Sequence, residues 1–354
     1  MTLDGLGWSP FFATAFERHA AEGREPARVA VPRRKHFLLY GAGGEVRGTV
    51  TGKMLYEATG PEELPTVGDW VVIERLPERE EASILDLLPR KSEFVRKVPG
   101  RRTDQQVVAA NADFVFLVSA LDERLTLRGL ERYLVVARES GAAPVVLLNK
   151  ADLCDEIEPI LEDVRIASRG VPVHVVSAKL GEGIDAIGSY LTEGITGALL
   201  GPSGAGKSTI INSLLGTDYL QTREVRDVDD RGRHVTTHRE LVVLPGGGLL
   251  IDTPGMRELQ LYAGLEGIAA TFDDIEELGT RCRFRDCRHE VEPGCAVQDA
   301  LAEGELDHGR FESYKKLLRE VAHRERKTDS AAERKHKEHW KKITLRHRRE
   351  KRKR

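Results

Sequence analysis

Residues 201–208 read Gly-Pro-Ser-Gly-Ala-Gly-Lys-Ser, and residues 252–255 read Asp-Thr-Pro-Gly. The first stretch fits the phosphate-loop pattern G-x4-G-K-[ST], whose glycines let backbone N–H groups turn inward around the phosphates of a nucleotide. Lys207 can reach the β and γ oxygens, and the Ser208 hydroxyl can bind Mg²⁺. Because this loop joins a buried strand to a helix, it predicts an α/β domain built on a parallel sheet.

The phosphate contacts are expected from the whole loop and from the start of the helix that follows it. The predicted phosphate-binding residues are Gly201, Ser203, Gly204, Ala205, Gly206, Lys207, Ser208 and Thr209. The positive end of the helix dipole adds to this site. Asp252 ends the apolar run 249–251 and can hold Mg²⁺ through water, while the backbone N–H of Gly255 is placed to sense the γ-phosphate.

Two further motifs predict which base is bound. In residues 149–152, Asn-Lys-Ala-Asp, the Asp152 carboxylate can accept from both N1–H and the exocyclic amine of guanine, whereas adenine offers no such pair of donors. Lys150 can lie over the ring, and Asn149 can tie its loop to the phosphate loop. A backbone N–H near the guanine O6 is expected from Ser177, Ala178 and Lys179. We therefore expect GTP or GDP with Mg²⁺.

The motifs run in an unusual order along the chain. The base-reading residues 149–152 and 177–179 precede the phosphate loop, whereas ordinary GTPases place the phosphate loop first. Apolar runs at 114–118, 144–148, 173–176 and 249–251 predict the buried strands of a circularly permuted domain with helices on both faces. A permuted order keeps the site intact and lets the segment after residue 255 lead directly into the C-terminal region.

A switch segment is expected between the phosphate loop and residue 252. Residues 231–238 read Arg-Gly-Arg-His-Val-Thr-Thr-His. A threonine of this segment should close over Mg²⁺ and the γ-phosphate, and Thr237 is favoured over Thr236. The predicted magnesium ligands are therefore Ser208, Thr237 and Asp252.

Hydrolysis needs a group that positions the attacking water. Many GTPases place a glutamine after the Asp-x-x-Gly turn, but here the residue is Met256, which cannot orient water. His234 is the nearest candidate by sequence, and a histidine that only contacts a partner is the alternative. The candidate catalytic residues are His234, Lys207 and Thr237.

A cluster of metal-binding residue types follows the nucleotide motifs. Its members, Cys282, Cys287, His289 and Cys295, offer three thiolates and one imidazole within fourteen residues. That is one complete tetrahedral shell for Zn²⁺ with no open position for a catalytic water, which indicates a structural site. The arginines between these ligands can present a basic surface to phosphate.

Changes in residue pattern along the chain predict three folded domains. Short apolar runs between turn residues in 34–100 are typical of a small β-barrel such as the OB-fold, which often binds oligonucleotides; a β-domain that only packs on its neighbour is the alternative. Residues after 268 are charged and helical. The expected segments are an extension at 1–33, the barrel at 34–100, the permuted G domain at 101–268, an α-helical zinc-binding domain at 269–327 and a basic tail at 328–354.

The net charge of −3 hides an asymmetry between the body and the tail. Residues 331–354 hold twelve Lys and Arg against three Glu, which leaves −12 on residues 1–330. This pattern indicates a polyanionic partner touched by one end, with a solvated tail as the alternative. No apolar run reaches the roughly 18 residues of a membrane helix, and the N-terminus lacks the pattern of a signal peptide. We expect a cytoplasmic monomer without a membrane partner.

Together these features resemble the ribosome small-subunit-dependent GTPase A (RsgA) family. The resemblance covers about residues 35–325 and is carried by the motif order, the barrel, the Gly-Arg-His-x-Thr-Thr switch, the apolar Met256 and the Cys-Cys-His-Cys cluster. It implies an OB-fold, a permuted G domain and a zinc domain. It also implies GTP hydrolysis that is stimulated by the small ribosomal subunit through rRNA, with the switch histidine involved. Val235 departs from the family, which often has a third threonine there.

Two other functions remain as alternatives. A non-enzymatic RNA-binding protein could use GTP only as a structural or switching ligand. An ATPase with a zinc-dependent DNA-binding module would require ATP to compete with GTP. Multiple turnover that rises with small subunits separates the first alternative from a GTPase, and the effect of Asp152→Asn on GTP against ATP separates the second.

Overall fold

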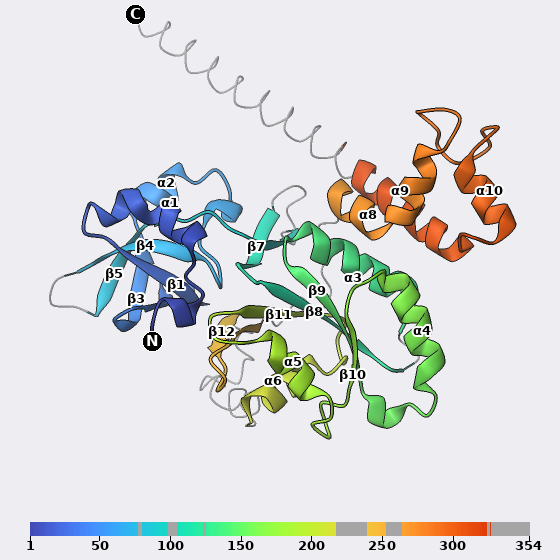
Figure 1. The fold of residues 1–354 in the computed structure, drawn as a ribbon. Coiled ribbons are helices and arrows are strands. Elements are labelled where there is room, and N and C mark those ends of the chain that lie inside the picture. The colour runs from blue at the N-terminus through green and yellow to red at the C-terminus, as the bar shows by residue number, and fades with distance from the viewer. Residues whose placement is uncertain are drawn as a thin grey trace, which may run out of the picture. The chain divides into compact units, whose positions relative to one another are not determined.

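The computed structural model describes residues 1–76, 80–97, 105–122, 125–216, 239–252, 264–323 and 326. The chain divides into two compact units, of which the first comprises residues 1–97 and 105–262 and the second residues 98–104 and 263–354. The first unit contains a barrel and a mixed α/β sheet, and the second is helical (Figure 1). No helix in the described ranges is both long and apolar enough to cross a membrane.

A closed five-stranded barrel forms the first part of unit one. The strands follow the order β1-β2-β3-β5-β4, and all neighbours are antiparallel except β3 and β5. Apolar side chains such as Leu39, Val71 and Ile84 alternate inward and fill the interior. The bounds are β1 (Glu25–Pro32), β2 (Phe37–Gly41), β3 (Gly44–Val50), α2 (Gly52–Glu57), η2 (Pro61–Glu63), β4 (Trp70–Arg75) and β5 (Glu81–Leu87).

The barrel begins at Glu25, earlier than the expected boundary at residue 34. Its first strand escapes detection because Arg28, which breaks the apolar pattern, points into the protein and is only 1% exposed. The preceding residues are also part of this unit. They form η1 (Asp4–Leu6) and α1 (Pro10–Ala20), and Trp8 and Phe12 pack on Trp70 at ring distances of 4.7 and 5.8 Å. Residues 1–33 are therefore not a separate extension.

A two-stranded hairpin follows the barrel and begins within the basic segment of residues 90–102. Strand β6 (Glu93–Lys97) pairs antiparallel with β7 (Gln105–Ala110). The basic residue at the start of that segment, Arg90, makes an ion pair with the fully buried Asp69 and is itself 11% exposed. The Arg90 guanidinium is therefore engaged in a structural ion pair and is not presented to phosphate.

The second part of unit one is a six-stranded sheet in the order β10-β9-β8-β11-β13-β12. All neighbours are parallel except β12 and β13, which are antiparallel. The apolar runs predicted as strands lie in this sheet. The bounds are β8 (Phe114–Ala120), β9 (Ala143–Asn149), β10 (Val173–Val176), β11 (Thr196–Leu200), β12 (Glu240–Val243) and β13 (Leu249–Asp252).

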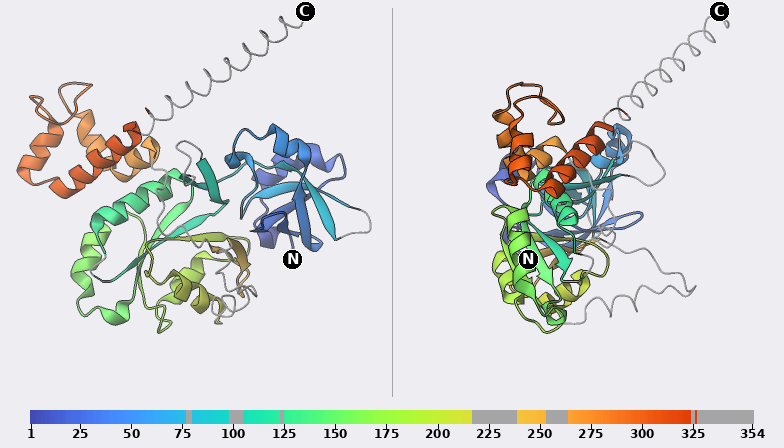
Figure 2. Two further views of the ribbon diagram at one scale, coloured as in Figure 1. Left: turned by 180° about the vertical axis from the view of Figure 1, so that it is seen from behind. Right: turned by 90° about the vertical axis from the view of Figure 1, so that its right-hand side faces the viewer.

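Helices cover both faces of the sheet (Figures 1 and 2). Successive residues of a strand point to opposite faces, so Leu117 packs with α3 and α4 while Phe116 packs with α5 and α6. The helices are α3 (Leu127–Glu139), α4 (Ile157–Ser168), α5 (Ile184–Tyr190) and α6 (Lys207–Leu215), and a short η3 (Ala151–Leu153) follows β9. The expected fold class, with a barrel before an α/β GTPase-type domain, is confirmed.

Unit two is built from helices around a small core. Its elements are α8 (Leu265–Thr271), α9 (Asp273–Thr280), α10 (Ala296–Glu303) and a helical stretch at 308–323. Phe272 is fully buried, its ring lies 5.6 Å from that of Tyr314, and Arg310 bridges to Asp274 at 2.8 Å. The residues after 268 are helical as expected, and apolar side chains of the stretch at 308–323, such as Phe311 and Leu317, are buried. The cysteine and histidine cluster lies between α9 and α10.

Candidate functional site

The sheet brings the nucleotide motifs to one edge. The base motif follows β9, the Ser177–Lys179 motif follows β10, the phosphate loop follows β11, and Asp252 is the last residue of β13. Because these four strands are parallel, their carboxyl ends meet at the same edge, where ligands bind in open α/β sheets. Motifs that are separated by up to a hundred residues in the chain therefore form one constellation.

The phosphate loop has the backbone that its glycines permit. Gly201, Gly204 and Gly206 all have positive φ, of 153, 77 and 95°. A Cβ at Gly201 would lie 2.1 Å from the carbonyl oxygen of Val118, so no larger residue fits against β8. Such a close backbone approach leaves the loop amides to point at a ligand.

Lys207 starts α6 and reaches back across the loop. Its Nζ donates to the carbonyl oxygens of Gly201 and Pro202, both at 2.7 Å. This places the ammonium group at the loop where phosphate oxygens would compete for its protons. Ser208 is half-buried one residue further along α6, and Thr209 is exposed. The start of α6 thus presents a lysine, a hydroxyl and the helix dipole together.

Asn149 joins the phosphate loop to the base-reading loops. Its Nδ2 donates to the carbonyl oxygen of Ala205 at 2.8 Å, and its Oδ1 accepts from the backbone N–H of Ala178 at 3.0 Å. The side chain is 2% exposed, and both ends of its amide are satisfied. One buried amide therefore sets the spacing between the segments expected to hold the phosphates and the base.

The two charged residues of the base motif are held by specific partners. Ser177 Oγ donates to Asp152 Oδ1 at 2.6 Å and so orients the carboxylate, which is exposed. Lys150 has a left-handed backbone with φ of 69°, and its Nζ lies 3.3 Å from Asp122 Oδ2. Lys179 follows in the Ser177–Lys179 turn and is exposed. Asp152 and Ser177 are thus in direct contact, and Lys150 is held by Asp122.

Asp122 is a residue of this site that the motifs did not reveal. It lies just beyond the end of β8, the strand between β9 and β11, and its side chain is 26% exposed. Asp122 stands two residues after Ala120, the last residue of β8, so the pattern that marked Asp252, a polar residue directly after an apolar run, does not mark it. It lacks a named motif, and for that reason it was missed.

Asp252 lies at the end of β13, opposite Glu240 of β12, and is 9% exposed. A nearly buried carboxylate at the sheet edge is chemically suited to a cation or its bound water. The remaining predicted residues, His234, Thr236, Thr237 and Gly255, lie outside the described residues, as does Met256.

The predicted metal ligands of unit two converge. The ligand atoms of Cys282, Cys287, His289 and Cys295 all lie within 4.8 Å of one another. His289 Nδ1 is 3.4 Å from Cys295 Sγ and 3.6 Å from Cys282 Sγ, so Nδ1 is the nitrogen turned toward the thiols. Three sulfurs and one imidazole nitrogen at this spacing match the donor set of a structural Zn²⁺ site.

The surroundings of the cluster fix the histidine and shift the pKa values of two thiols in opposite directions, since burial raises the pKa of Cys287 to about 11. Burial raises the pKa of the Cys282 thiol, but hydrogen bonds from the backbone N–H groups of Val297 and Ala296 at the start of α10 outweigh it and hold that pKa below its ordinary value. Gln298 Nε2 donates to the carbonyl oxygen of His289 at 2.6 Å, where the backbone has φ of 56°. Such outer contacts orient metal ligands, and their irregular spacing gives no sequence signal.

The Glu292 carboxylate shapes the loop between the predicted metal ligands. Glu292 accepts backbone N–H bonds from Arg288 at 2.9 Å and from Glu290 at 2.8 Å, and these bonds lower the pKa of Glu292 to about 2. These hydrogen bonds fold the loop around the Glu292 carboxylate. It presents Phe284 and Val291, which are 42% and 92% exposed.

Known proteins are similar to this chain in sequence and in fold. The family model described as RsgA GTPase matches residues 87–262. A relative from Opitutus terrae, named small ribosomal subunit biogenesis GTPase RsgA, is 47% identical over 352 residues, which cover 97% of this chain and 96% of the relative. A relative of the same name from Streptomyces coelicolor is 42% identical and covers 93% of this chain and 89% of its own length.

Solved structures agree with this. YjeQ from Thermotoga maritima superposes with a TM-score of 0.62 at 26% identity, covering 84% of this chain and 99% of that one. YloQ, described as a circularly permuted GTPase, superposes with a TM-score of 0.61 at 22% identity and covers 85% and 96%, which supports the fold. With relatives above 40% identity along nearly its whole length, this chain belongs to the RsgA GTPase family.

Proposed function

We propose that this chain binds GTP with Mg²⁺, hydrolyses it to GDP and phosphate, and acts as a late maturation and release checkpoint on the small ribosomal subunit. The observation that carries the nucleotide part is the amide bridge of Asn149, which joins the phosphate loop at Ala205 to the base loop at Ala178. The ribosomal part is supported by the relatives, which are named small ribosomal subunit biogenesis GTPases.

Guanine would be read by the exposed Asp152 carboxylate, which Ser177 holds in place. Lys150 would cover the base, while Asp122 keeps its ammonium group near the sheet edge. A carboxylate at this position accepts from both donors of the guanine edge, and adenine would meet it with an acceptor and no matching donors. The site is therefore suited to GTP over ATP.

Mg²⁺ would be held by Ser208 and, through water, by Asp252, with Thr237 completing the site in the GTP state. The half-buried hydroxyl and the nearly buried carboxylate fit a hard cation that prefers oxygen ligands. When bound, the ion neutralises charge that develops on the phosphate oxygens. Lys207 and the loop amides add fixed positive groups on the same side.

The attacking water needs another partner because Met256 stands where many GTPases have a glutamine. We assign this role to His234 of the switch segment, which carries an imidazole that can accept a proton or orient water. Intrinsic turnover should then be slow, since the histidine must be placed by a partner. Contact with the small subunit and its rRNA is the expected stimulus.

Zn²⁺ would be bound by the three cysteines and His289, and its role would be structural. The four ligand atoms complete a tetrahedral shell without leaving a position for substrate. The folded loop and its arginines would then meet rRNA together with the barrel. A cytoplasmic monomer fits this role.

The deciding experiment measures phosphate release from GTP with and without purified small ribosomal subunits. Wild type should turn over many times, and subunits should raise the rate. Lys207→Ala should abolish turnover, and His234→Ala should bind GTP but lose the stimulated rate. His238→Ala, in the same segment, is the matched control and should keep that rate.

Three results would count against the proposal. An unchanged rate with subunits removes the ribosomal role. Nucleotide binding and subunit binding without turnover would favour the alternative, an RNA-binding protein that uses GTP as a ligand only. Asp152→Asn that weakens GTP and ATP equally would contradict guanine recognition.

A further inference from the structure

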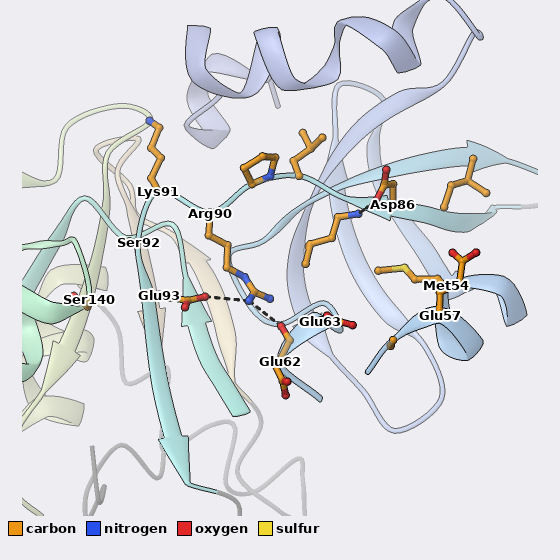
Figure 3. A pocket seen from close by; sticks show the side chains of 15 residues that line it. Met54, Glu57, Glu62, Glu63, Asp86, Arg90, Lys91, Ser92, Glu93 and Ser140 are labelled. Atoms are coloured by element: carbon orange, nitrogen blue, oxygen red, sulfur yellow. Dashed lines mark hydrogen bonds and ion pairs between the residues drawn. The ribbon is translucent and has the colours of Figure 1, made fainter. Parts of the chain in front are cut away.

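A pocket of about 720 Å³ lies beside the barrel (Figure 3). Its walls are α2, η2, the end of β5 and residues 88–93, and Ser140 at the end of α3 closes one side. None of the residues that line it belongs to a nucleotide or metal motif. The pocket is therefore a feature that the GTPase reaction does not explain.

Part of the pocket wall is apolar. α2 is six residues long and contains no fully buried residue, and its Met54 is partly buried against the barrel core. Its Leu55 and Tyr56 are 56% and 90% exposed beside the pocket. Exposed aromatic and aliphatic side chains next to a hollow are typical of protein interfaces. The apolar lining side chains are Met54, Leu85, Leu87, Leu88 and Pro89.

The other part of the wall is acidic. The carboxylates are Glu57, Glu62, Glu63, Asp86 and Glu93, and the basic side chains are Arg90 and Lys91. Arg90 is already engaged, because its Nε and Nη2 lie 2.8 and 2.9 Å from the two oxygens of the buried Asp69. Figure 3 shows Lys91 pointing away from Arg90, and its Nζ lies 4.9 Å from the ring of Phe12. Two of the carboxylates have basic partners, because Asp86 lies 2.8 Å from Arg18 and Glu93 lies 3.1 Å from Arg90. Glu57 lies 3.9 Å from the exposed Lys53, so the remaining negative charge of the pocket is centred on Glu57, Glu62 and Glu63.

This charge decides which class of partner fits. Phosphate groups would meet like charge on the carboxylate rim, so nucleic acid is disfavoured at this face. A segment that carries Lys or Arg and one or two apolar side chains would find complementary groups for both. Proteins that bind rRNA carry such basic segments to neutralise phosphate.

We propose that this pocket docks an extended, Lys/Arg-bearing segment of a protein of the small ribosomal subunit. An apolar side chain of that segment contacts Met54 and Leu87, and its cations pair with Glu57 and Glu62. The inference rests on the proposed function, because the small subunit is the assembly that brings such a segment to the barrel. It divides the barrel surface into a part that meets protein and other parts that are open to rRNA.

The first test identifies what touches the pocket. The full chain carries a benzophenone amino acid in place of the exposed Tyr56 and is irradiated on purified small subunits with a non-hydrolysable GTP analogue. Mass spectrometry should find a cross-link to a Lys/Arg-rich peptide of a subunit protein. A cross-link to rRNA, to the basic residues 331–354 of this chain itself, or no cross-link from a bound chain overturns the proposal.

The second test measures the charge contribution. Glu57→Lys with Glu62→Lys should weaken co-sedimentation with small subunits roughly fivefold to tenfold while leaving GTP affinity unchanged. The matched control reverses two exposed charges on α4, Glu158→Lys with Glu162→Lys, and should change binding less than about twofold. Equal losses in both variants would show a general charge effect and overturn the proposal.

An apolar variant guards against a folding defect. Leu55→Ala with Tyr56→Ala removes only exposed groups, so the barrel should fold, and subunit binding should fall by a similar factor. Unchanged binding in this variant overturns the apolar half of the contact. If wild type itself fails to bind small subunits, the proposed function fails with it. Binding with the pocket variants at wild-type level sinks this inference alone.

Discussion

At the scale of single residues, Gly206 leaves room for the amide that joins the two halves of the nucleotide site. Its φ is +95°, and a Cβ built there would lie 2.1 Å from Asn149 Nδ2. That nitrogen is fixed by its bond to Ala205, so it cannot move aside without losing the contact. The glycine of the phosphate-loop pattern thus serves a neighbouring side chain as well as the phosphate.

Gly206→Ala should lower GTP affinity at least about tenfold and the free energy of unfolding by about 2–3 kcal/mol. The strained backbone and the broken bond of Asn149 both contribute. Fluorescent-nucleotide titration and chemical unfolding measure the two effects. Gly188→Ala is the control, because Gly188 lies within α5 with open space around its Cβ and should stabilise by about 0.5–1 kcal/mol. Matching behaviour of the two variants would contradict this account.

The sequence predicted the residues that carry named motifs and missed those that support them. Asn149, Asp152 and Lys207 are recognisable because each belongs to a short motif whose internal spacing suits nucleotide binding. Asp122 lies 3.3 Å from Lys150, and Gln298 lies 2.6 Å from the His289 carbonyl oxygen. Both act by supporting a neighbouring site residue, and a residue from another position in the chain could make the same contact. Supporting contacts of this kind are defined only in three dimensions.

At the scale of elements, α1 is attached to the barrel through a buried histidine. The His19 ring is 4% exposed, with Arg18 Nε 3.0 Å from its Nε2 and Arg24 Nη1 2.9 Å from its Nδ1. Burial, with these two arginines, lowers the pKa of His19, although Asp86 and Glu22 act in the opposite direction. The folded state therefore disfavours the protonated ring.

This depressed pKa makes stability depend on pH. The contribution of neutral His19 is fully present above its unfolded pKa of about 6.5 and is lost as the pH falls through that value toward the lower folded pKa. Melting temperature should drop between about pH 7.5 and 5.5 by more in wild type than in His19→Gln. His323→Gln, which changes an exposed histidine, should keep the wild-type drop. A His19→Gln profile that falls as steeply as wild type would rule out this origin.

The loop between α9 and α10 should depend on bound metal, because its four candidate ligands converge. Cys295→Ser should reduce bound zinc from about one ion per chain to a small fraction and should unfold unit two, because one thiolate of the complete shell is lost. Metal analysis and circular dichroism measure both changes. Cys154→Ser is the matched control, since this half-buried thiol lies outside the cluster and should retain the zinc. Equal zinc in both variants would refute a Cys₃His site.

The sequence predicted the strands that form continuous apolar runs, and the strands that it missed share a common cause. β8 and β9 are continuous apolar runs, which only a strand buried on both faces needs. β1 and β6 contain charged residues, and the sequence cannot show that Arg28 is buried or that residues 93–97 find a partner in β7. Strand pairing and burial of a charge depend on the folded structure, and they override local pattern.

At the scale of the whole first unit, one arginine joins the barrel to the sheet domain. Arg28 of β1 donates to the carbonyl oxygens of Leu6, Gly68 (3.2 Å) and Asn111 (2.9 Å), which belong to the N-terminal segment, the barrel and the start of the G domain. Burial lowers the pKa of Arg28 to about 10, so the group stays charged at neutral pH. Asn111 Nδ2 also donates to Gly68. The barrel and the G domain thus share a buried polar junction.

The two parts should unfold together in wild type, and Arg28→Ala should separate them. Three buried carbonyls would lose a charged donor, which should lower the free energy of unfolding by about 3 kcal/mol. Calorimetry should show the barrel melting before the G domain, and saturating GTP should raise only the later transition. Arg33→Ala, which removes an exposed arginine just after β1, should leave the wild-type profile unchanged. A single transition that GTP shifts as a whole in Arg28→Ala would show that packing alone couples the two domains, and that the buried arginine is dispensable for it.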